Sequence, residues 1–258
     1  MDLKLKNKLY VVTGATSGFG KAIALRLLEE GATVIINARG EEKLAAMAKK
    51  HPQNLETING DITTDAVISR LKMQIGERPL SGLVINAGGP PAKSFMDTDI
   101  TDWDDAYKSV LRWKVKLTQE LLPTLGSDGH GRIVYIESVS VKQPIENLVL
   151  SNSLRLSVVG FVKTLSQEVA HQGITLNIIA PGYHATPAMD RLFVKKSKIT
   201  GESIDEARTN FVSEVPVGRM GDADDLASLA AWLLSPWSGY VTGQTISVDG
   251  GLAQGVFS

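Results

Sequence analysis

The sequence predicts an α/β fold, a doubly wound parallel sheet of about seven strands with helices on both faces. Short β-branched runs alternate with longer amphipathic segments along the chain, which is the signature of repeated βαβ units. Runs such as those around Ile35 and Val84 are apolar at consecutive positions, as expected of strands that helices cover on both sides. A chain of 258 residues can form such a fold as one domain, and no repeat or composition break marks a second.

Seven strands are expected in runs rich in Val, Ile, Leu and Thr: Leu9–Thr13, Thr33–Asn37, Leu55–Asn59, Gly82–Asn86, Ile133–Ser138, Thr175–Ala180 and Thr245–Val248. Four helices are clear between them: Gly20–Glu30, Trp103–Leu125, Ser153–His171 and Asp222–Leu234. In the first helix Ile23 and Leu27 lie on one apolar face, and Gly31 follows as a C-terminal cap.

The polar stretch Pro187–Val215 lies between the sixth and seventh strands and predicts a substrate lid. Its lysines 195, 196 and 198 have two interpretations. They would attract a phosphate-bearing substrate such as an acyl-carrier or coenzyme A thioester, or they form an ordinary solvated surface.

The composition excludes several classes of function. Lys and Arg (27) balance Asp and Glu (28), so no overall field recruits nucleic acid or an anionic membrane. Cysteine is absent, which excludes disulfides, thiolate catalysis and Cys-ligated metals, and no metal site is expected. The N-terminus does not resemble a signal peptide, and no apolar run approaches the ~18–20 residues of a membrane-spanning helix. We expect a cytoplasmic protein.

The strongest motif is the glycine-rich turn TGATSGFG at 13–20, which follows a strand and opens a helix. Glycines permit a tight turn and close backbone approach, and the helix N-terminus presents free N–H groups to a pyrophosphate. A glycine-rich turn alone would not require a ligand. The strand before it and the helix after it favour a dinucleotide site.

Arg39 follows the second strand, where an acidic residue would bind the ribose 2′-hydroxyl of NAD. No carboxylate is present in Asn37-Ala38-Arg39, and a guanidinium can pair with a 2′-phosphate. This pattern predicts NADP as the cofactor, with NAD less favoured. The alternative is that Arg39 is a solvated loop cation.

With glycines 14, 18 and 20 spaced as TGxxxGxG, the chain resembles the classical short-chain dehydrogenase/reductase family, which has a Rossmann-type fold. Further matches run almost from end to end, and the closest likeness is to β-ketoacyl-acyl-carrier-protein reductases. They include Asp61-Ile62, Asn86-Ala87-Gly88, GRIVYIESVS ending the fifth strand, and Pro181-Gly182 with Thr186. The resemblance implies cofactor contacts at Gly14, Thr16, Ser17, Gly18, Phe19, Gly20, Arg39, Asp61, Ile62, Asn86, Ala87, Gly88, Arg155, Pro181, Gly182 and Thr186.

The family's four active residues are Asn, Ser, Tyr and Lys, and the chain keeps only the serine, as Ser138. Val110 stands in the place of the Asn, Ser151 in that of the Tyr and Arg155 in that of the Lys. A phenol beside a cation can donate a proton to an alkoxide, whereas an aliphatic hydroxyl is far less acidic. Arginine can hold ribose hydroxyls but is a poor proton shuttle.

His184 is the candidate replacement for the lost acid, because it follows Pro181-Gly182-Tyr183 at the carboxyl end of a strand. An imidazole with a pKa near 6.5 suits proton transfer at neutral pH. The alternative is a histidine that is exposed on a loop or contacts the cofactor carboxamide only through its backbone. The candidate catalytic residues are therefore Ser138, Ser151, Arg155 and His184.

Two functions are compatible with these residues. The first is an NADP-dependent oxidoreductase acting on a small carbonyl or alcohol substrate, with 3-oxoacyl thioesters among the candidates. The second is a catalytically impaired dinucleotide-binding protein acting as a sensor or structural subunit, since fold alone does not guarantee chemistry. The resemblance also implies a homotetramer, for which the apolar residues of the helix at 153–171 supply enough surface.

Overall fold

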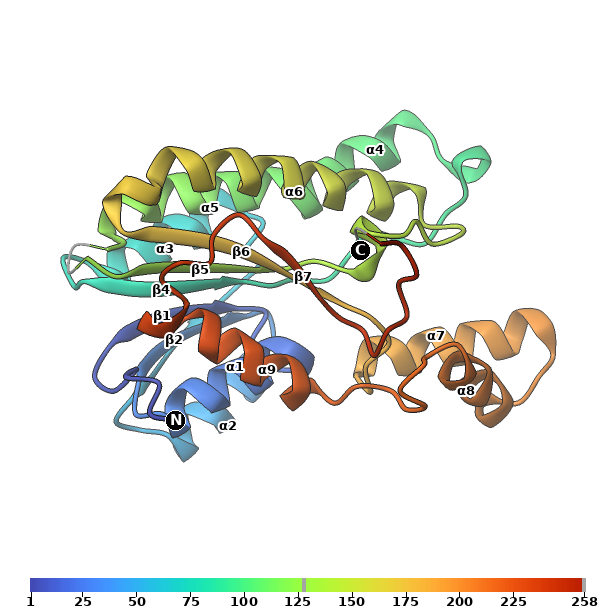
Figure 1. Ribbon diagram of the computed structural model, residues 1–258, viewed down its shortest axis with the longest axis horizontal. Coiled ribbons are helices and arrows are strands. Elements are labelled where there is room, and N and C mark those ends of the chain that lie inside the picture. Colours follow the sequence, from blue (N-terminus) through green and yellow to red (C-terminus); the bar gives the residue numbers. More distant parts are fainter. Residues whose placement is uncertain (127–128, 257–258) are drawn as a thin grey trace.

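The computed structural model describes residues 1–126 and 129–256, and its centre is a seven-stranded parallel sheet (Figure 1). The strand order is β3-β2-β1-β4-β5-β6-β7. The strands are β1 Leu9–Thr13, β2 Thr33–Ala38, β3 Leu55–Asn59, β4 Leu80–Ile85, β5 Gly131–Ile136, β6 Ile174–Pro181 and β7 Thr245–Val248. The predicted fold class is confirmed, and the strand order reverses between β1 and β4, where open α/β sheets bind ligands.

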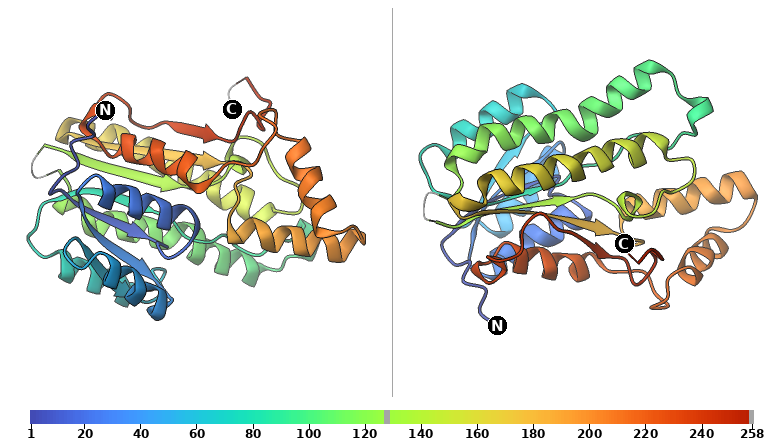
Figure 2. Two further views of the ribbon diagram at one scale, coloured as in Figure 1. Left: turned by 90° about the horizontal axis from the view of Figure 1, so that it is seen from below. Right: turned by 45° about the horizontal axis from the view of Figure 1, so that its top comes forward.

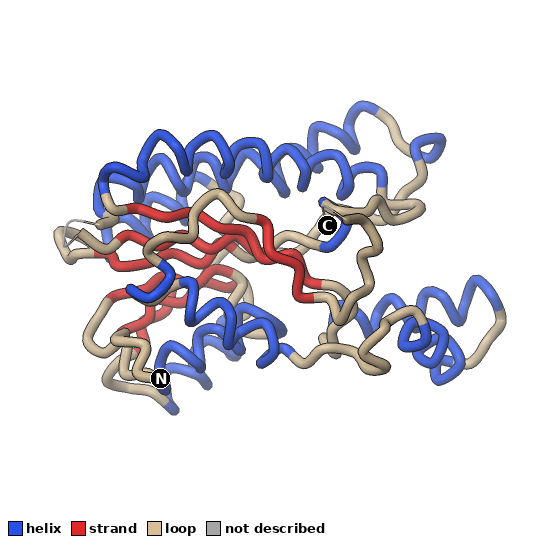
Figure 3. The backbone as a smooth tube through the Cα atoms, viewed as in Figure 1, coloured by secondary structure: helices blue, strands red, loops and turns tan. Residues whose placement is uncertain are grey.

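Helices cover both faces of this sheet (Figures 1 and 3). One face is packed by α1 Gly18–Glu29, α2 Glu41–Lys50 and α9 Ala223–Leu233. The other is packed by α3 Asp65–Ile75, α5 Trp113–Leu121 and α6 Val149–Val169. Because both faces are covered, the central strands β1 and β4 are buried at every position and are mostly apolar.

The predicted helix Trp103–Leu125 is not one continuous α-helix. The chain forms α4 Ile100–Ala106, a π-helical stretch η2 Tyr107–Arg112, and then α5. A π turn inserts an extra residue and so rotates the following side chains relative to the preceding ones. Val110, within the π-helical stretch, and Lys114, in the first turn of α5, are both buried.

The predicted lid is helical: α7 Pro187–Thr200 and α8 Ile204–Ser213 project beyond the carboxyl ends of the strands (Figure 2). The two helices pack on a small apolar cluster separate from the two main ones, centred on Met189, Phe193 and Ala207. Phe211 and Tyr183 join this cluster, with ring centroids 4.9 Å apart. None of the described helices is long and apolar enough to span a membrane.

Candidate active site

The glycine-rich turn forms a cradle in which side chains do not fit. Gly14 has φ +61°, and a Cβ there would lie 2.7 Å from the carbonyl oxygen of Asn86. A Cβ built on Gly20 would lie even closer to the protein, against the carbonyl oxygen of Gly14. Ser17 precedes α1, but its side chain makes no capping hydrogen bond, so the helix N-terminus is open to an anion. This turn fits the pyrophosphate of a dinucleotide.

Asn86 ties this turn to the end of β4. The Thr13 hydroxyl donates to the Asn86 carbonyl at 2.8 Å and accepts from the Asn86 N–H at 2.8 Å. The Asn86 side-chain amide donates to the carbonyl of Gly14 at 3.3 Å. Ala87 and Gly88 continue the loop, and nothing lies within 4 Å of a Cβ built on Gly88. The backbone at Gly88 is therefore accessible to a ligand.

Arg39 lies exposed directly after β2, and no described carboxylate forms an ion pair with it. The Asn59 amide donates to its carbonyl at 3.0 Å, which fixes the backbone and leaves the guanidinium free to meet an anion. The Asp61 carboxylate is already hydrogen-bonded, because its Oδ1 accepts from the backbone N–H and from the hydroxyl of Thr63. Ile62 is buried under this turn.

The segment after β6 approaches the same turn. The methyl group of Thr186 lies 3.7 Å from a Cβ built on Gly18, and Gly182 packs against the backbone of Asp249. Thr186 precedes α7, and Pro187 opens that helix. The residues predicted to contact the cofactor, from Gly14 to Thr186, thus gather at the carboxyl edge of the sheet, except that Arg155 reaches it from α6.

Ser151 and Arg155 occupy the first two turns of α6 and are both buried. Arg155 Nε donates to Ser151 Oγ at 3.1 Å. Ser138 follows β5 at the start of a short 3₁₀ turn, and its Oγ accepts from the N–H of Ser140 at 3.2 Å. Both serine oxygens accept a hydrogen bond from the protein, and neither hydroxyl donates to a group in the described residues, so its hydrogen is available to a ligand.

A buried charge network surrounds Arg155 and was not predicted. Glu137, the last residue before Ser138, accepts from Arg155 Nη1 at 2.9 Å through Oε2 and from the Lys114 ammonium through Oε1. Burial holds the pKa of Lys114 below its usual value, and the adjacent carboxylate opposes this shift. A carboxylate directly after an apolar strand and a lysine in the apolar face of a helix were the available sequence signals.

Val110 stands one turn before Lys114 and is buried within the π-helical stretch. The irregular helix therefore persists without the asparagine of the family pattern. Trp113, beside Lys114, is fully buried and donates through Nε1 to the carbonyl of Ser109 at 2.8 Å.

His184 does not lie with Ser138, Ser151 and Arg155. Its ring packs edge-on against Phe19 with centroids 5.0 Å apart, on the α1 and α9 side of the sheet. Nδ1 is 3.2 Å from the Gly182 carbonyl, and Nε2 is buried with no hydrogen-bond partner among the described residues. Burial holds the pKa of this imidazole below its usual value. The geometry brings the two serines and Arg155 into one group and separates His184 from it.

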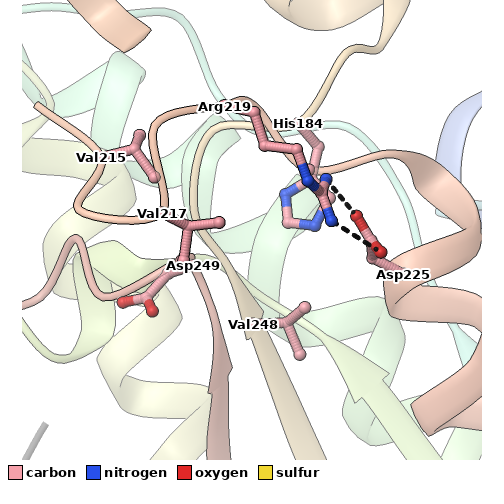
Figure 4. Close-up of a pocket in the computed structure, with 9 residues that line it drawn as sticks. His184, Val215, Val217, Arg219, Asp225, Val248 and Asp249 are labelled. Carbon is pink, nitrogen blue, oxygen red and sulfur yellow. Dashed lines mark hydrogen bonds and ion pairs between the residues drawn. The ribbon is translucent and has the colours of Figure 1, made fainter. Parts of the chain in front are cut away.

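The His184 ring lines a cavity of about 140 Å³ between the segment 215–225 and the end of β7. Val215, Val217 and Val248 form its apolar walls, and Figure 4 shows Arg219 and Asp225 paired beside the ring. Two hydrogen bonds of 2.7 and 3.2 Å join these two side chains and hold the pKa of Asp225 at about 2.

The Tyr183 hydroxyl donates to Glu214 of the predicted lid at 3.0 Å, and burial raises the pKa of Tyr183 to about 12. Lys196 lies 3.8 Å from Glu202 and 4.8 Å from the ring of Phe211. The side chain of Lys195 lies outside the described part of the chain. Of the predicted lysine cluster, Lys196 thus contacts other residues of the segment 187–215.

Comparisons with known protein sequences find relatives that match almost the whole chain. Residues 14–253 match the protein family described as Enoyl-(Acyl carrier protein) reductase. A putative ketoacyl reductase of Streptomyces coelicolor is 34% identical over 253 residues, covering 95% of this chain and 97% of that protein. The 3-oxoacyl-[acyl-carrier-protein] reductase FabG of Haemophilus influenzae is 32% identical, covering 96% of this chain and 99% of that one.

Solved structures of reductases superpose on almost the whole chain. YwfH, an NADPH-dependent reductase involved in bacilysin biosynthesis, superposes with a TM-score of 0.92 at 26% identity, covering 97% of this chain and all of the other. Actinorhodin polyketide ketoreductase with NADPH gives 0.90 at 33% identity, covering 96% and 98%. With the cradle, the strand order and these matches together, the chain belongs to the short-chain dehydrogenase/reductase family of NAD(P)-dependent oxidoreductases, close to the 3-oxoacyl-acyl-carrier-protein reductases.

Proposed function

We propose that this protein is an NADPH-dependent reductase of a small carbonyl substrate, with 3-oxoacyl thioesters as the first class to test. The observation that carries the proposal is the glycine cradle at the open N-terminus of α1, with the unpaired Arg39 at the next strand end. Relatives named as ketoacyl reductases and neighbours named as NADPH-dependent support the substrate class and the cofactor. A homotetramer in the cytoplasm belongs to the same proposal, on family resemblance.

The cofactor would be held at three places. The α1 N-terminus with Gly14, Gly18 and Gly20 receives the pyrophosphate, with Thr16, Ser17 and Phe19 in the same turn. Arg39 pairs with the 2′-phosphate. Asn86 to Gly88 and the segment of Pro181, Gly182 and Thr186 form the walls nearest the reacting ring. When bound, NADPH supplies the hydride that is transferred to the substrate carbonyl carbon.

Charge develops on the carbonyl oxygen as its π electrons move onto it, and the protein must stabilise that charge. The Ser138 hydroxyl hydrogen is free to donate to this oxygen, and Arg155 supplies a positive charge beside Ser151. Ser151 cannot replace a tyrosine as acid, because an aliphatic hydroxyl is weakly acidic. We assign the final proton to water. We assign His184 a packing role against Phe19 of the glycine-rich turn and no role in proton transfer.

NADPH oxidation with a panel of 3-oxoacyl thioesters, ketones, aldehydes and sugars tests this function. We expect turnover with at least one class, and Ser138→Ala should lower kcat about 100-fold, the usual effect of removing one oxyanion donor. His184→Ala should retain most of the activity. Firm NADPH binding with no turnover on any member of the panel would contradict the proposed reductase.

A further inference from the structure

Three charged side chains meet inside the protein next to the active serines. The side chains of Lys114, Glu137 and Arg155 are only 3%, 0% and 10% exposed. They come from α5, from the end of β5 and from α6, so three elements position them. Each carboxylate oxygen of Glu137 is paired with a different cation. We call these three residues the charge triad.

The charges of the three side chains in the charge triad do not cancel. Two cations surround one carboxylate, so with all three ionised a net charge of +1 is left in a buried place. Burying an uncompensated charge is costly, and proteins keep one only where something compensates it. Lys114 and Glu137 are the two most buried members, so the excess belongs to Arg155, the member nearest the surface.

Arg155 has one nitrogen to spare. Its Nε donates to Ser151 and its Nη1 to Glu137, whereas Nη2 donates to no group in the described residues. A Cβ built on Gly89 would lie 2.9 Å from Nη2, so this nitrogen lies under the loop that follows β4. Gly89 is exposed, and its loop continues directly from Gly88 of the proposed cofactor wall. The free donor thus lies at the edge of the site.

A proton relay is a poor account of this arrangement. Arginine stays protonated at physiological pH and cannot pass a proton from Glu137 to Ser151. It can offer a fixed charge and directed N–H groups, which suit an anionic oxygen. Glu137 fixes the direction of the guanidinium, and Lys114 neutralises Glu137, so the charge on Arg155 is not cancelled.

We propose that Lys114 and Glu137 are positioning residues that hold Arg155 as a fixed cationic donor for an anionic substrate oxygen, either a carboxylate or the alkoxide that forms from the carbonyl. The inference rests on the proposed reductase, because it places this oxygen beside Ser138 and Ser151. It goes further in stating why three charges are buried, and it predicts that ligands with a carboxylate are preferred over neutral ones of the same shape.

Charge-altered variants separate this role from a merely structural one. Lys114→Met reduces the net charge of the triad from +1 to 0, and Glu137→Gln raises it to +2. The double variant Lys114→Met/Glu137→Gln restores a net charge of +1, carried by Arg155 alone, because the side chains at positions 114 and 137 are then neutral. A structural role predicts that the double variant is worse than either single one, whereas the electrostatic role predicts recovery.

The probe is acetate, with acetamide as its neutral counterpart of the same shape. Calorimetric titrations at pH 7 and constant ionic strength would measure the affinities of acetate and acetamide for the free protein and for its NADP⁺ complex. For Lys114→Met we expect acetate affinity to fall at least tenfold, acetamide to be unaffected and NADP⁺ affinity to change less than threefold. The double variant should bind acetate within about threefold of wild type.

Unchanged acetate affinity in a folded Lys114→Met, or no recovery in a folded double variant, would overturn the proposal. If the single variant does not fold, the double variant and Arg155→Met decide: the first must bind acetate and the second must not. Failure of the wild-type protein to bind NADP⁺ would count against the proposed reductase alone, because acetate binding to the free protein still tests the charge triad.

Discussion

At the scale of single residues, two buried polar groups differ in how they are satisfied. Arg155 uses its fork on Ser151 and Glu137 and keeps one nitrogen for a ligand. His184 has Nδ1 near the Gly182 carbonyl, whereas its buried Nε2 has no partner in the part of the chain that the structure describes. A buried imidazole with one unmade hydrogen bond is tolerated only in its neutral form, because charging it would add a desolvation cost.

The neutral state of His184 predicts a pH effect on stability. Because its pKa is lower in the folded protein than in the unfolded chain, the unfolded chain binds more protons as the pH falls below about 6.5. Stability should therefore decrease on acidification from pH 7 towards 5, by at most about 1.4 kcal/mol per pH unit for one proton. His184→Gln should flatten this slope in urea unfolding at pH 7, 6 and 5. An unchanged slope in His184→Gln would show that another group is responsible, and His171→Gln, on the surface, is the matched control.

At the scale of elements, regular strands could be predicted and irregular helices could not. The strands Leu9–Thr13, Leu55–Asn59 and Thr245–Val248 have the predicted bounds, because β-branched runs between turn residues specify them locally. The π-helical stretch at 107–112 has no such local signature, and it packs against α6, which lies far away in the sequence. Glu137 and Lys114 were missed for the same reason: each is 23 residues from the other, and only the fold brings them together.

The predicted lid, α7 and α8, packs on one aromatic cluster. Phe211 contacts Phe193 with centroids 5.5 Å apart and Tyr183 with centroids 4.9 Å apart. Phe211→Ala removes both ring pairs, each worth about 0.5–1.5 kcal/mol beyond burial. We expect limited proteolysis within 187–213 to become roughly tenfold faster, with little change in the global unfolding transition. Ile199→Ala, at an exposed position of α7, is the control. Equal cleavage rates in both variants would mean that the cluster does not hold the lid.

At the scale of the whole molecule, the proposed dinucleotide site consists of segments that are distant in the sequence. The glycine turn precedes α1, Arg39 follows β2, Asn86 follows β4 and Thr186 precedes the lid. All of these lie at the carboxyl edge of one sheet, because every strand is parallel. A ligand that contacts them all binds only the folded chain, so its affinity must appear in the stability of the whole protein.

NADPH should therefore raise the melting temperature, and NADH should raise it less. At 100 times its Kd a ligand stabilises the fold by about 2.7 kcal/mol, which corresponds to roughly 5–10 °C for a chain of this size. Arg39→Asp should abolish most of the NADPH shift and leave the NADH shift intact, because an aspartate repels the 2′-phosphate but not a ribose hydroxyl. Lys49→Asp makes the same charge change at the exposed end of α2 and should preserve both shifts. A larger shift with NADH than with NADPH in the wild-type protein would refute the role of Arg39. Equal losses in the two variants would reduce that role to general electrostatics, since a specific phosphate contact requires the guanidinium at the end of β2.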